Sequence, residues 1–595
     1  VLVNDGTASF SLLDHYDVGT DPRGVHAADI NGDGWTDIYV SNDYQVPDYL
    51  YINNKKGGFT DQLKSSIGHT SHFSMGSDVA DLNNDASPDI MTLDMLPEDN
   101  RRQKLLMAPD NYEKFDLNVR LGFNHQYMRN MLHINDGNGS FREIGQLAGV
   151  SNTDWSWSAL FADFDNNGWK DLYITNGYLR DYTNMDFLKH MSDYVQNQQQ
   201  GIQRSDVLKL VYEIPSSNLT NYAFRNSSDL TFTNATKDWG MDRPSNSNGA
   251  AYADLDNDGD LDLVVNNVNL PAFVYQNQAN TLLKHHYLKV KTQGKAPNTQ
   301  GLGAQVTLYS GGKQQYLEQM PTRGYQSSVS PTLHFGLGET ATIDSLRVVW
   351  PTGKQQVVAN PKVDQILTVA ETDAKGTYQW PGSAPALFEE TTSPVAFQDA
   401  TPDINDFYRQ PLLVNPLSFS TPVLSKKDVD GDGLEDVFVG GSKGQASALF
   451  VQQKGGSFVK KAIPAFEANA AGAVTDAVFF DANGDGFPDL YVAYGGYADF
   501  EPNDARFQDK LYLNDGKGTF TLSANALPAI LTSTGAVCAG DFSGDGKPDL
   551  FVGGRVVPGR YPELPESYIL VNDGRGNFTN RTAAVSSPIS KLGLV

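Results

Sequence analysis

The sequence predicts an all-β protein made of repeated four-stranded units, and three observations support this prediction. The 595 residues include 55 Gly and 29 Pro, a frequency that favours many tight turns over long helices. An acidic nine-residue pattern recurs seven times, each time directly before a short apolar run. Where no insertion intervenes, the copies begin 52, 53 and 60 residues apart, which leaves room for about four short strands. Units of this size are the blades of a β-propeller.

The chain divides into four predicted segments. A first propeller covers residues 1–284 and is expected to be incomplete at its N-terminus, because Val1–Gly6 has the pattern of a strand and turn already under way. Residues 285–371 contain alternating strands and almost no helical periodicity, which predicts an inserted small β-sandwich. A linker with several Gly and Pro residues, 372–394, precedes a second propeller segment, 395–595, which is expected to be incomplete at its C-terminus.

Each acidic loop is followed by strands of the kind that a blade requires. Apolar runs such as Ile38–Val40 and Leu490–Val492 come directly after a loop, and a second run such as Leu511–Gly516 ends in Asn-Asp-Gly. Because Gly and Asn accept the positive φ of a tight turn, this ending predicts a hairpin. The wider gaps at 99–130 and 180–212 contain helix-like runs, which predicts short helical insertions on a face of the propeller.

The seven loops follow the pattern D-x-(D/N/S)-x-(D/N)-x-x-x-D, with oxygen donors at positions 1, 3, 5 and 9. Together with a backbone carbonyl at position 7, such a loop surrounds a hard cation with six or seven oxygens, and calcium fits this best. The predicted ligands are, loop by loop, Asp29, Asn31, Asp33, Trp35 and Asp37; Asp81, Asn83, Asp85, Ser87 and Asp89; Asp163, Asp165, Asn167, Trp169 and Asp171; Asp254, Asp256, Asp258, Asp260 and Asp262; Asp428, Asp430, Asp432, Leu434 and Asp436; Asp481, Asn483, Asp485, Phe487 and Asp489; and Asp541, Ser543, Asp545, Lys547 and Asp549. Gly at position 6 permits a left-handed backbone in six loops, whereas the second has Ala86, and the seventh has the neutral Ser543 at position 3.

A simpler interpretation treats each loop as a solvated turn without a metal. One copy would leave both interpretations open, but seven copies in fixed register before a strand favour the metal. Carboxylates held this close together repel one another unless a cation lies between them. Up to seven structural Ca²⁺, each with two positive charges, would offset about half of the net charge of -26.

Charge and composition exclude several other classes. A net charge of -26 without a Lys/Arg cluster argues against nucleic acid as a partner. The single cysteine, Cys538, cannot form an intramolecular disulfide and is predicted to be a small core residue. The sequence shows neither an apolar run of about 18 residues nor a charged-then-apolar leader, so it predicts no membrane span and no signal peptide within this segment. We expect both natural termini to lie outside it.

The repeats resemble the FG-GAP/VCBS repeats of integrin α-subunit propellers over residues 1–284 and 415–595. Between them, residues 285–371 resemble an ASPIC/UnbV domain, and the whole arrangement is similar to cartilage-acidic-protein-like surface proteins of Bacteroidota. The motifs that carry the second resemblance are Tyr287–Val290, Gly301–Ala304, Arg323–Ser327, His334–Gly338 and Val349–Gly353. The resemblance implies structural calcium. Extracellular calcium modules have Kd values of about 10⁻⁴ to 10⁻³ M, so the chain is expected outside the cell or on its surface, anchored to the outer membrane if bacterial.

The resemblance also implies that ligands dock on the face opposite the calcium loops. The residues predicted there are His72, Trp155, Trp157, Asn246 and Asn248, a set that suits a carbohydrate or a peptide. The alternative is a structural role, in which the two Trp side chains pack between blades and the two Asn side chains bond the backbone.

These observations predict a calcium-stabilised extracellular binding or adhesion protein that presents its propeller faces to a glycan or protein. An accessory subunit of an outer-membrane uptake or surface complex is one such role. The alternative is a calcium-dependent polysaccharide lyase or hydrolase on the same scaffold, although the sequence shows no identifiable catalytic constellation. Gly440–Gly444 matches G-x-S-x-G, but a strand follows it where a nucleophile elbow needs a helix, so we predict a hairpin turn.

Overall fold

The computed structural model describes residues 2–4, 10–12, 16, 21–108, 111–197, 203–381, 387–400, 404–419 and 421–593. The chain forms two compact units, unit 1 (Val1–Pro385) and unit 2 (Ala386–Val595). Both units consist mainly of small antiparallel sheets, so the all-β prediction is confirmed.

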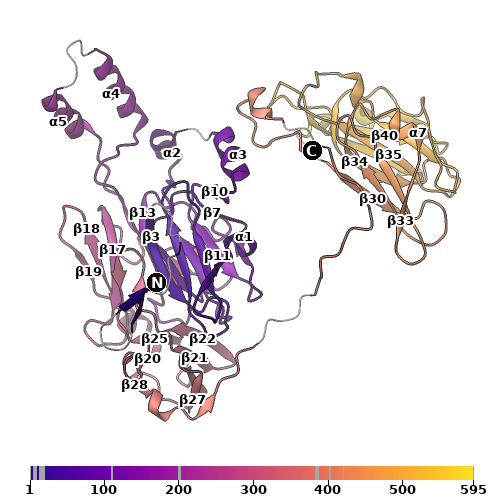
Figure 1. The fold of residues 1–595 in the computed structure, drawn as a ribbon. Coiled ribbons are helices and arrows are strands. Elements are labelled where there is room, and N and C mark those ends of the chain that lie inside the picture. Colours follow the sequence, from indigo (N-terminus) through magenta and orange to yellow (C-terminus); the bar gives the residue numbers. More distant parts are fainter. Residues whose placement is uncertain are drawn as a thin grey trace. The chain divides into compact units, whose positions relative to one another are not determined.

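Four sheets of unit 1 have the arrangement of propeller blades, with each strand antiparallel to the one before it (Figure 1). Their strands are β3 (Pro22–Ala28), β4 (Asp37–Asn42), β5 (Tyr49–Asn53) and β6 (Phe59–Asp61); β8 (Ser77–Ala80), β9 (Asp89–Thr92), β11 (Met131–Asn135) and β12 (Phe141–Glu143); β13 (Ser156–Ala162), β14 (Asp171–Asn176), β15 (Tyr222–Asn226) and β16 (Phe232–Asn234); and β17 (Ser247–Ala253), β18 (Asp262–Asn267) and β19 (Phe273–Tyr275). In each blade the acidic loop joins the first strand to the second. The first strands of successive blades lie side by side.

The second strand of a blade is apolar on both faces because it contributes to two cores. Leu172 and Ile174 of β14 pack into one buried cluster, whereas Tyr173 packs into the next. All six residues of β14 are buried. The uninterrupted apolar run after each acidic loop therefore reflects a strand covered on both sides by neighbouring blades.

The predicted helical insertions are present in unit 1. The helices are α2 (Asn100–Leu106) and α3 (Tyr112–Arg120), which precede β11, and α4 (Met185–Asn197) and α5 (Arg204–Glu213), which precede β15. Asp99 caps α2 by accepting a hydrogen bond from the backbone N–H of Arg102 at 2.8 Å. Smaller elements of unit 1 are β1 (Leu2–Asn4), β2 (Phe10–Leu12), α1 (Leu63–Ser66), the parallel pair β7 (His69–Ser71) and β10 (His125–Tyr127), and α6 (Ala279–Leu283).

Residues 286–377, called the module below, form two sheets around one apolar core. One sheet has the order β25-β20-β28 and the other β22-β21-β26-β27-β29. The strands are β20 (His286–Gln293), β21 (Gln305–Ser310), β22 (Lys313–Glu318), β25 (Leu333–Gly338), β26 (Ser345–Val349), β27 (Lys354–Ala359), β28 (Gln365–Ala370) and β29 (Gly376–Thr377). Trp350 and Phe335 are fully buried between the sheets, as a sandwich requires. β29 falls in the range predicted as linker and pairs with β27.

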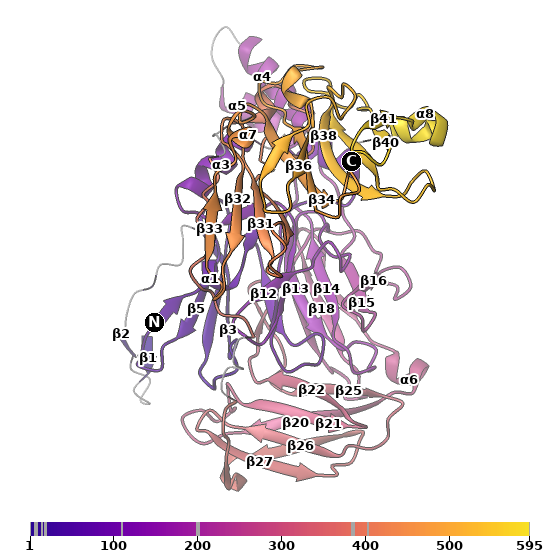
Figure 2. The ribbon, with the colours of Figure 1, turned by 90° about the vertical axis from the view of Figure 1, so that its right-hand side faces the viewer.

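The module and the helices α2–α5 lie at opposite ends of the blades of unit 1 (Figures 1 and 2). A two-stranded hairpin of the module, β23 (Thr322–Arg323) and β24 (Ser327–Ser328), extends back between the first strands of the blades. Residues 322–328 are called the central hairpin below. It contacts β3 and β8 through β23, and β17 through β24.

Unit 2 contains three four-stranded blades (Figure 2). The strands are β30 (Val423–Lys427), β31 (Asp436–Gly440), β32 (Ala448–Gln452) and β33 (Phe458–Lys461); β34 (Ala473–Phe480), β35 (Asp489–Gly495), β36 (Lys510–Asn514) and β37 (Phe520–Leu522); and β38 (Ser533–Gly540), β39 (Asp549–Val556), β40 (Tyr568–Asn572) and β41 (Phe578–Asn580), with the short helices α7 (Pro464–Glu467) and α8 (Thr582–Val585). Gly440 ends β31, and residues 441–447 connect it to the antiparallel strand β32, so the predicted hairpin turn at Gly440–Gly444 is confirmed.

The prediction that Cys538 is a core residue is wrong. Cys538 lies in β38 and is exposed. Its neighbour Val537 packs against a buried cluster, and successive side chains of a strand point to opposite faces. The apolar sequence Ala-Val-Cys-Ala did not reveal which face of the strand is covered.

A buried tyrosine–aspartate pair recurs between the strands of a blade in both units. The Tyr39 hydroxyl donates to Asp48 at 2.6 Å, and the Tyr491 hydroxyl donates to Asp509 at 2.7 Å. Asp509 also accepts from the backbone N–H of Tyr494 and from the Thr534 hydroxyl. Burial nevertheless raises the pKa of Asp509, and likewise that of Asp48, to about 7.

Asp509 is therefore expected to make unit 2 less stable as the pH rises from about 4 to about 7. In this window the unfolded chain releases the proton, since an unperturbed Asp has a pKa of about 3.9, while the folded chain retains it. Each pH unit then costs up to about 1.4 kcal/mol. Asp509→Asn removes this pH-dependent loss of stability. The unfolding free energy of the variant, relative to that of the parent chain, is therefore expected to increase with pH.

Urea denaturation of both proteins at pH 5 and pH 7 measures the difference, because the pH dependence of all other groups is common to the two. Glu563→Gln, at an exposed carboxylate of the same unit, is the control and is expected to show no such trend. A difference between Asp509→Asn and the parent that stays constant with pH would contradict the shifted pKa.

Candidate functional site

The acidic loops share one backbone geometry, built around the aspartate at position 1. In the first loop, Asp29 accepts the N–H of Asp33 at 2.9 Å with Oδ1 and the N–H of Gly34 at 2.8 Å with Oδ2. The N–H of position 6 donates to the aspartate of position 1 in all seven loops. Ala86 adopts a φ of 72° and makes this contact in the second loop, so the left-handed turn forms there without Gly.

The aspartate at position 9 fixes the loop to the strands on both sides. Asp37 Oδ2 accepts the N–H of Ile30 at 3.0 Å, and its Oδ1 accepts the N–H of Asn53 at 2.8 Å. The same pair of contacts recurs at Asp89, Asp171, Asp262, Asp436 and Asp489. Position 9 therefore aligns the loop with the end of the third strand of its own blade.

Three of the loops bring carboxylates together as a cation site requires. One oxygen from each member of Asp163, Asp165 and Asp171 lies within 4.8 Å of the others, and the same holds for Asp254, Asp256 and Asp262 and for Asp428, Asp430 and Asp436. In the first, second and sixth loops the Asn at position 3 donates to the carboxylate at position 5. Carboxylate, amide and carbonyl oxygens are the ligands that Ca²⁺ prefers, so the donor set fits this ion.

Burial opposes ionisation of these carboxylates in the absence of a cation. It raises the pKa of Asp37 and Asp163 to about 7 and that of Asp489 to about 6, and it also raises the pKa of Asp89 and Asp171 well above the ordinary value of an aspartate. A nearby positive charge favours the charged form of a carboxylate. A divalent cation in the loop therefore compensates the burial of its aspartates.

In five of the seven described blades, an asparagine at or just after the end of the third strand bonds the acidic loop of the preceding blade. Asn135 Nδ2 donates to the carbonyl of Ile30 at 2.8 Å, and Asn514 Nδ2 donates to the carbonyl of Val429 at 2.8 Å. Equivalent contacts are made by Asn226, Asn277 and Asn572. The sequence pattern predicts only a hairpin-turn role for the Asn of Asn-Asp-Gly. The sequence signal for its contact with the preceding loop is that an Asn recurs at the end of the second apolar run after successive acidic loops.

Asn135→Ala is expected to lower the unfolding free energy of unit 1 by about 1–3 kcal/mol. The substitution leaves the buried carbonyls of Ile30 and Pro88 without their donor. Denaturant unfolding measures the loss, with Asn138→Ala as the matched control, because Asn138 is exposed and bonds only within its own turn. Equal stability of the two variants would show that the hydrogen bond from Asn135 to the preceding loop contributes little to the unfolding free energy.

The module covers the acidic loops of unit 1. Gln305 Nε2 donates to Asp29 Oδ2 at 2.6 Å, and Lys289 forms a buried ion pair with Asp254. His334 Nε2 lies 2.6 Å from Asn166 Oδ1 in the third loop. These contacts hold the outer side of three loops, and no sequence pattern predicted them.

Two loop glycines allow this close approach. A Cβ at Gly34 would lie 2.2 Å from the Trp380 ring, and a Cβ at Gly259 would lie 1.9 Å from the Tyr287 ring. Both glycines also have a positive φ. Position 6 therefore serves the turn and, in these two loops, the contact with aromatic side chains that follow the blades in sequence.

The central hairpin carries a buried cation into the space between the first strands of the blades. Arg323 Nη1 donates to Asp78 Oδ1 at 3.0 Å and to the carbonyl of Val79 at 2.6 Å. The backbone N–H of Tyr325 donates to the Ser158 hydroxyl at 3.2 Å. The central hairpin thus starts at the end of the blades that carries the acidic loops and reaches the opposite end of β8 and β13. There the Tyr325 ring centre lies 5.1 Å from the Trp157 ring centre.

The residues predicted for the ligand face have different surroundings in the structure. Trp155 and Trp157 are largely buried and lie 6.4 Å apart, ring centre to ring centre. Asn246 is buried, and its amide nitrogen donates to the carbonyls of Tyr178 and Ser217 when the group is oriented to satisfy both. Asn248 is half-buried, and its carbonyl accepts from the Thr175 hydroxyl. His72 belongs to a second aromatic group, with Tyr44 and Phe73.

Comparison with known proteins places the chain in a family. The model of the FG-GAP-like repeat matches residues 29–92, 115–174, 204–265, 428–492 and 501–552, just over half of the chain, and these segments contain all seven loops. The model of the ASPIC and UnbV domain matches residues 294–376. Cartilage acidic protein 1 of Xenopus tropicalis is 25% identical over 380 residues, which cover 62% of this chain and 48% of the relative. The match thus spans about half of the relative's length.

Three solved structures are distantly similar to the chain. An exotype rhamnogalacturonan lyase is 14% identical with a TM-score of 0.18, over 50% of this chain and 49% of that chain. A biofilm matrix protein of V. cholerae is 12% identical with a TM-score of 0.16, over 90% and 74%. A rhamnogalacturonan lyase of Bacillus licheniformis is 12% identical with a TM-score of 0.16, over 94% and 82%. Scores this low carry no argument about function.

Among the described residues, none of the helices is both long and apolar enough to cross a bilayer. The segments that the two family models match are the blades with their acidic loops and the inserted domain of the structure. The chain belongs to the family of proteins with FG-GAP-like repeats, and it carries an ASPIC and UnbV domain between two sets of these repeats.

Proposed function

We propose that the chain is an extracellular or cell-surface binding protein whose blades are stabilised by up to seven Ca²⁺. The observation that supports this most strongly is the common geometry of the loops, in which the same N–H groups orient the position-1 aspartate seven times. The side chains at positions 1, 3, 5 and 9 and the carbonyl at position 7 would hold the ion. Its charge would allow the buried carboxylates to ionise.

Membership of the repeat family and the similarity to cartilage acidic protein 1 support an extracellular or surface location. Calcium reaches millimolar concentrations outside cells, which is the range in which extracellular calcium modules fill. A role as an accessory subunit of an outer-membrane uptake or surface complex agrees with this location.

The ligand of unit 1 is a glycan or a protein that docks at the end of the blades carrying α2–α5. The module already occupies the loop end, through Gln305, Lys289 and His334. The opposite end is where Trp155, Trp157 and the inserted helices lie. A ligand that docks at this end would not have to displace the module.

Two measurements on the purified chain test this function. Equilibrium dialysis is expected to show several Ca²⁺ per chain, up to seven, at millimolar free calcium. A glycan array combined with an assay for unsaturated or reducing-end products is expected to show binding without turnover. Product formation would contradict the assignment as a binding protein, and a chain that takes up no calcium would contradict the role of the loops.

A further inference from the structure

Five aromatic side chains gather at the end of the unit 1 blades that is remote from the acidic loops. They are Trp155, Trp157, Tyr178 and Tyr182 of the third blade and its insertion, and Tyr325 of the central hairpin, and they are called the aromatic platform below. The Trp155 and Tyr178 rings stack 4.7 Å apart, and Tyr182 lies 5.2 Å from Tyr178. Tyr178 and Tyr182 are 38% and 44% exposed, whereas the other three are buried beneath them. The rings of Tyr178 and Tyr182 are therefore accessible to solvent and pack on buried aromatic side chains.

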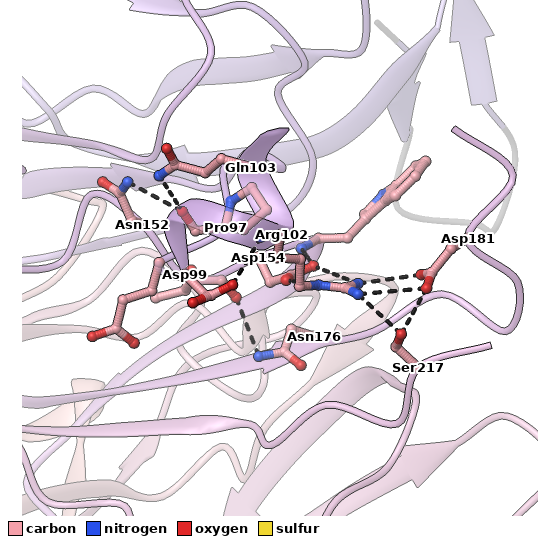
Figure 3. A network of polar contacts seen from close by, with 12 residues as sticks. Pro97, Asp99, Arg102, Gln103, Asn152, Asp154, Asn176, Asp181 and Ser217 are labelled. Atoms are coloured by element: carbon pink, nitrogen blue, oxygen red, sulfur yellow. Dashed lines mark hydrogen bonds and ion pairs between the residues drawn. The ribbon is translucent and has the colours of Figure 1, made fainter. Parts of the chain in front are cut away.

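A polar network holds the segments on which the platform is built (Figure 3). Arg102 of α2 forms ion pairs with both Asp154 and Asp181, the residues directly before Trp155 and Tyr182. Ser217 donates to Asp181 at 2.6 Å, which adds the chain segment before β15. Segments of the chain that are distant in sequence, namely α2, the residues around Asp154 and the insertion that contains Asp181 and Ser217, therefore hold the rings in place. Because the rings are fixed before a ligand binds, the entropic cost of binding is lower.

The platform also contains a polar group whose partner is missing within the described part of the chain. Trp155 is 9% exposed, and its Nε1 is buried and has no acceptor among the described residues, whereas Trp157 Nε1 donates to the carbonyl of Gly177 at 2.9 Å. A buried N–H without an acceptor is costly. A water or a ligand hydroxyl would supply the acceptor that this N–H lacks among the described residues.

Around the platform, aspartates outnumber the arginines with which they form ion pairs. Arg23 pairs with Asp21 and Asp43, and both Arg23 and Asp43 lie close enough to Tyr182 to influence it electrostatically. Arg102 likewise pairs with two carboxylates. Arg180, between Tyr178 and Tyr182 in sequence, donates to the carbonyl of Ile214 at 2.9 Å. The surroundings thus offer donors and acceptors for hydroxyl groups, whereas the excess of carboxylates, on a chain with a net charge of -26, disfavours an anionic ligand.

We propose that the aromatic platform is a subsite for one ring of a neutral saccharide. The apolar C–H face of a sugar ring stacks on Tyr178, which itself stacks on Trp155, and Tyr182, inclined by 68° to Tyr178, contacts the side of the sugar. The hydroxyl groups of the sugar bond the polar groups at the edge. Two rigid aromatic rings that meet at 68°, beside polar side chains, match a ligand that is apolar on one face and rich in hydroxyls at its rim. This proposal rests on the proposed binding function and specifies its ligand class. Because Tyr325 comes from the module, the subsite is shared between the repeats and the ASPIC and UnbV domain.

Isothermal titration of the full chain in millimolar CaCl₂ tests the subsite. The probes are neutral hexasaccharides of glucose, xylose and mannose, with an oligogalacturonate of equal length as the acidic arm. At least one neutral probe is expected to bind. Tyr178→Ala and Tyr182→Ala are each expected to weaken that binding about tenfold or more, since rigid aromatic anchors carry much of the affinity of such sites. Tyr182→Phe is expected to retain it, because the ring face is kept.

Tyr212→Ala is the matched control, because Tyr212 is 74% exposed on α5 of the same insertion and outside the platform. Melting curves confirm that each variant is folded. The subsite is refuted if no neutral probe binds, if the oligogalacturonate binds more tightly, or if the Tyr178 and Tyr182 variants bind like the parent. Each of these results leaves the proposed function standing when calcium uptake is normal, whereas absent calcium uptake refutes the proposed function itself.

Discussion

Chelation of calcium by excess EDTA is expected to lower the melting temperature of both units by about 10 °C or more. Each site filled at about ten times its Kd contributes roughly 1.4 kcal/mol to stability. Unit 1 has four loops and unit 2 has three, so the loss in each unit sums to about 4–6 kcal/mol. A loss of about 1 kcal/mol shifts the melting temperature of a unit of this size by about 2–4 °C. Differential scanning calorimetry with and without EDTA measures the effect, and restoration by CaCl₂ but not by MgCl₂ attributes it to calcium.

A pair of neighbouring substitutions separates calcium binding from general loss of charge. Asp436→Asn removes the charge of the position-9 ligand in the fifth loop, and Glu435→Gln removes the charge of the exposed residue beside it. The first is expected to reduce the calcium bound by one ion per chain, and the second is expected to leave it unchanged. An unchanged melting temperature in EDTA, with seven intact loops, would remove the structural role of the ion.

Arg323→Met is expected to destabilise unit 1 by about 3–5 kcal/mol. The substitution leaves Asp78, which is completely buried, without its counter-charge and leaves the carbonyl of Val79 without a donor. The central hairpin also loses the contact that fixes it to the second blade. Denaturant unfolding measures the change, and Lys313→Ala, at an exposed position of the module, is the control.

A double substitution distinguishes the ion pair from the packing around it. When Asp78→Asn is combined with Arg323→Met, no unpaired charge remains buried, so part of the lost stability is expected to return. A double variant as unstable as the sum of its two single variants would show that the ion pair itself contributes nothing. The cost would then come from the shape of the Arg323 side chain.

The parts of the fold that repeat were predictable from the sequence. Seven copies of one pattern identified the blades, and the strands that follow Asp37 and Asp489 lie where the apolar runs placed them. The helical run at Met185 was recognisable from its periodicity, because helices and strands differ in the spacing of their apolar residues.

Features that depend on long-range packing were not predictable. Gln305 and Asp29 are 276 residues apart, and Arg323 and Asp78 are 245 apart, so no local pattern connects them. Tyr178 and Tyr325 were absent from the predicted ligand face, since only their positions in space place them beside Trp155 and Trp157. Exposure of Cys538 was missed for a related reason, because one strand does not reveal which of its faces a neighbour covers.

The position of the central hairpin has a consequence for how this protein can be divided. A sequence-based boundary near residue 285 separates Arg323 from Asp78 and Tyr325 from Ser158, although each pair is in contact. Expressed alone, the first 284 residues would expose to solvent the space between the first strands of the blades, and the Asp78 carboxylate would lack its ion-pair partner. The second piece would carry the central hairpin without the strands that surround it. Evolutionary exchange of this ASPIC and UnbV domain between proteins would accordingly have to carry the preceding repeats along with it.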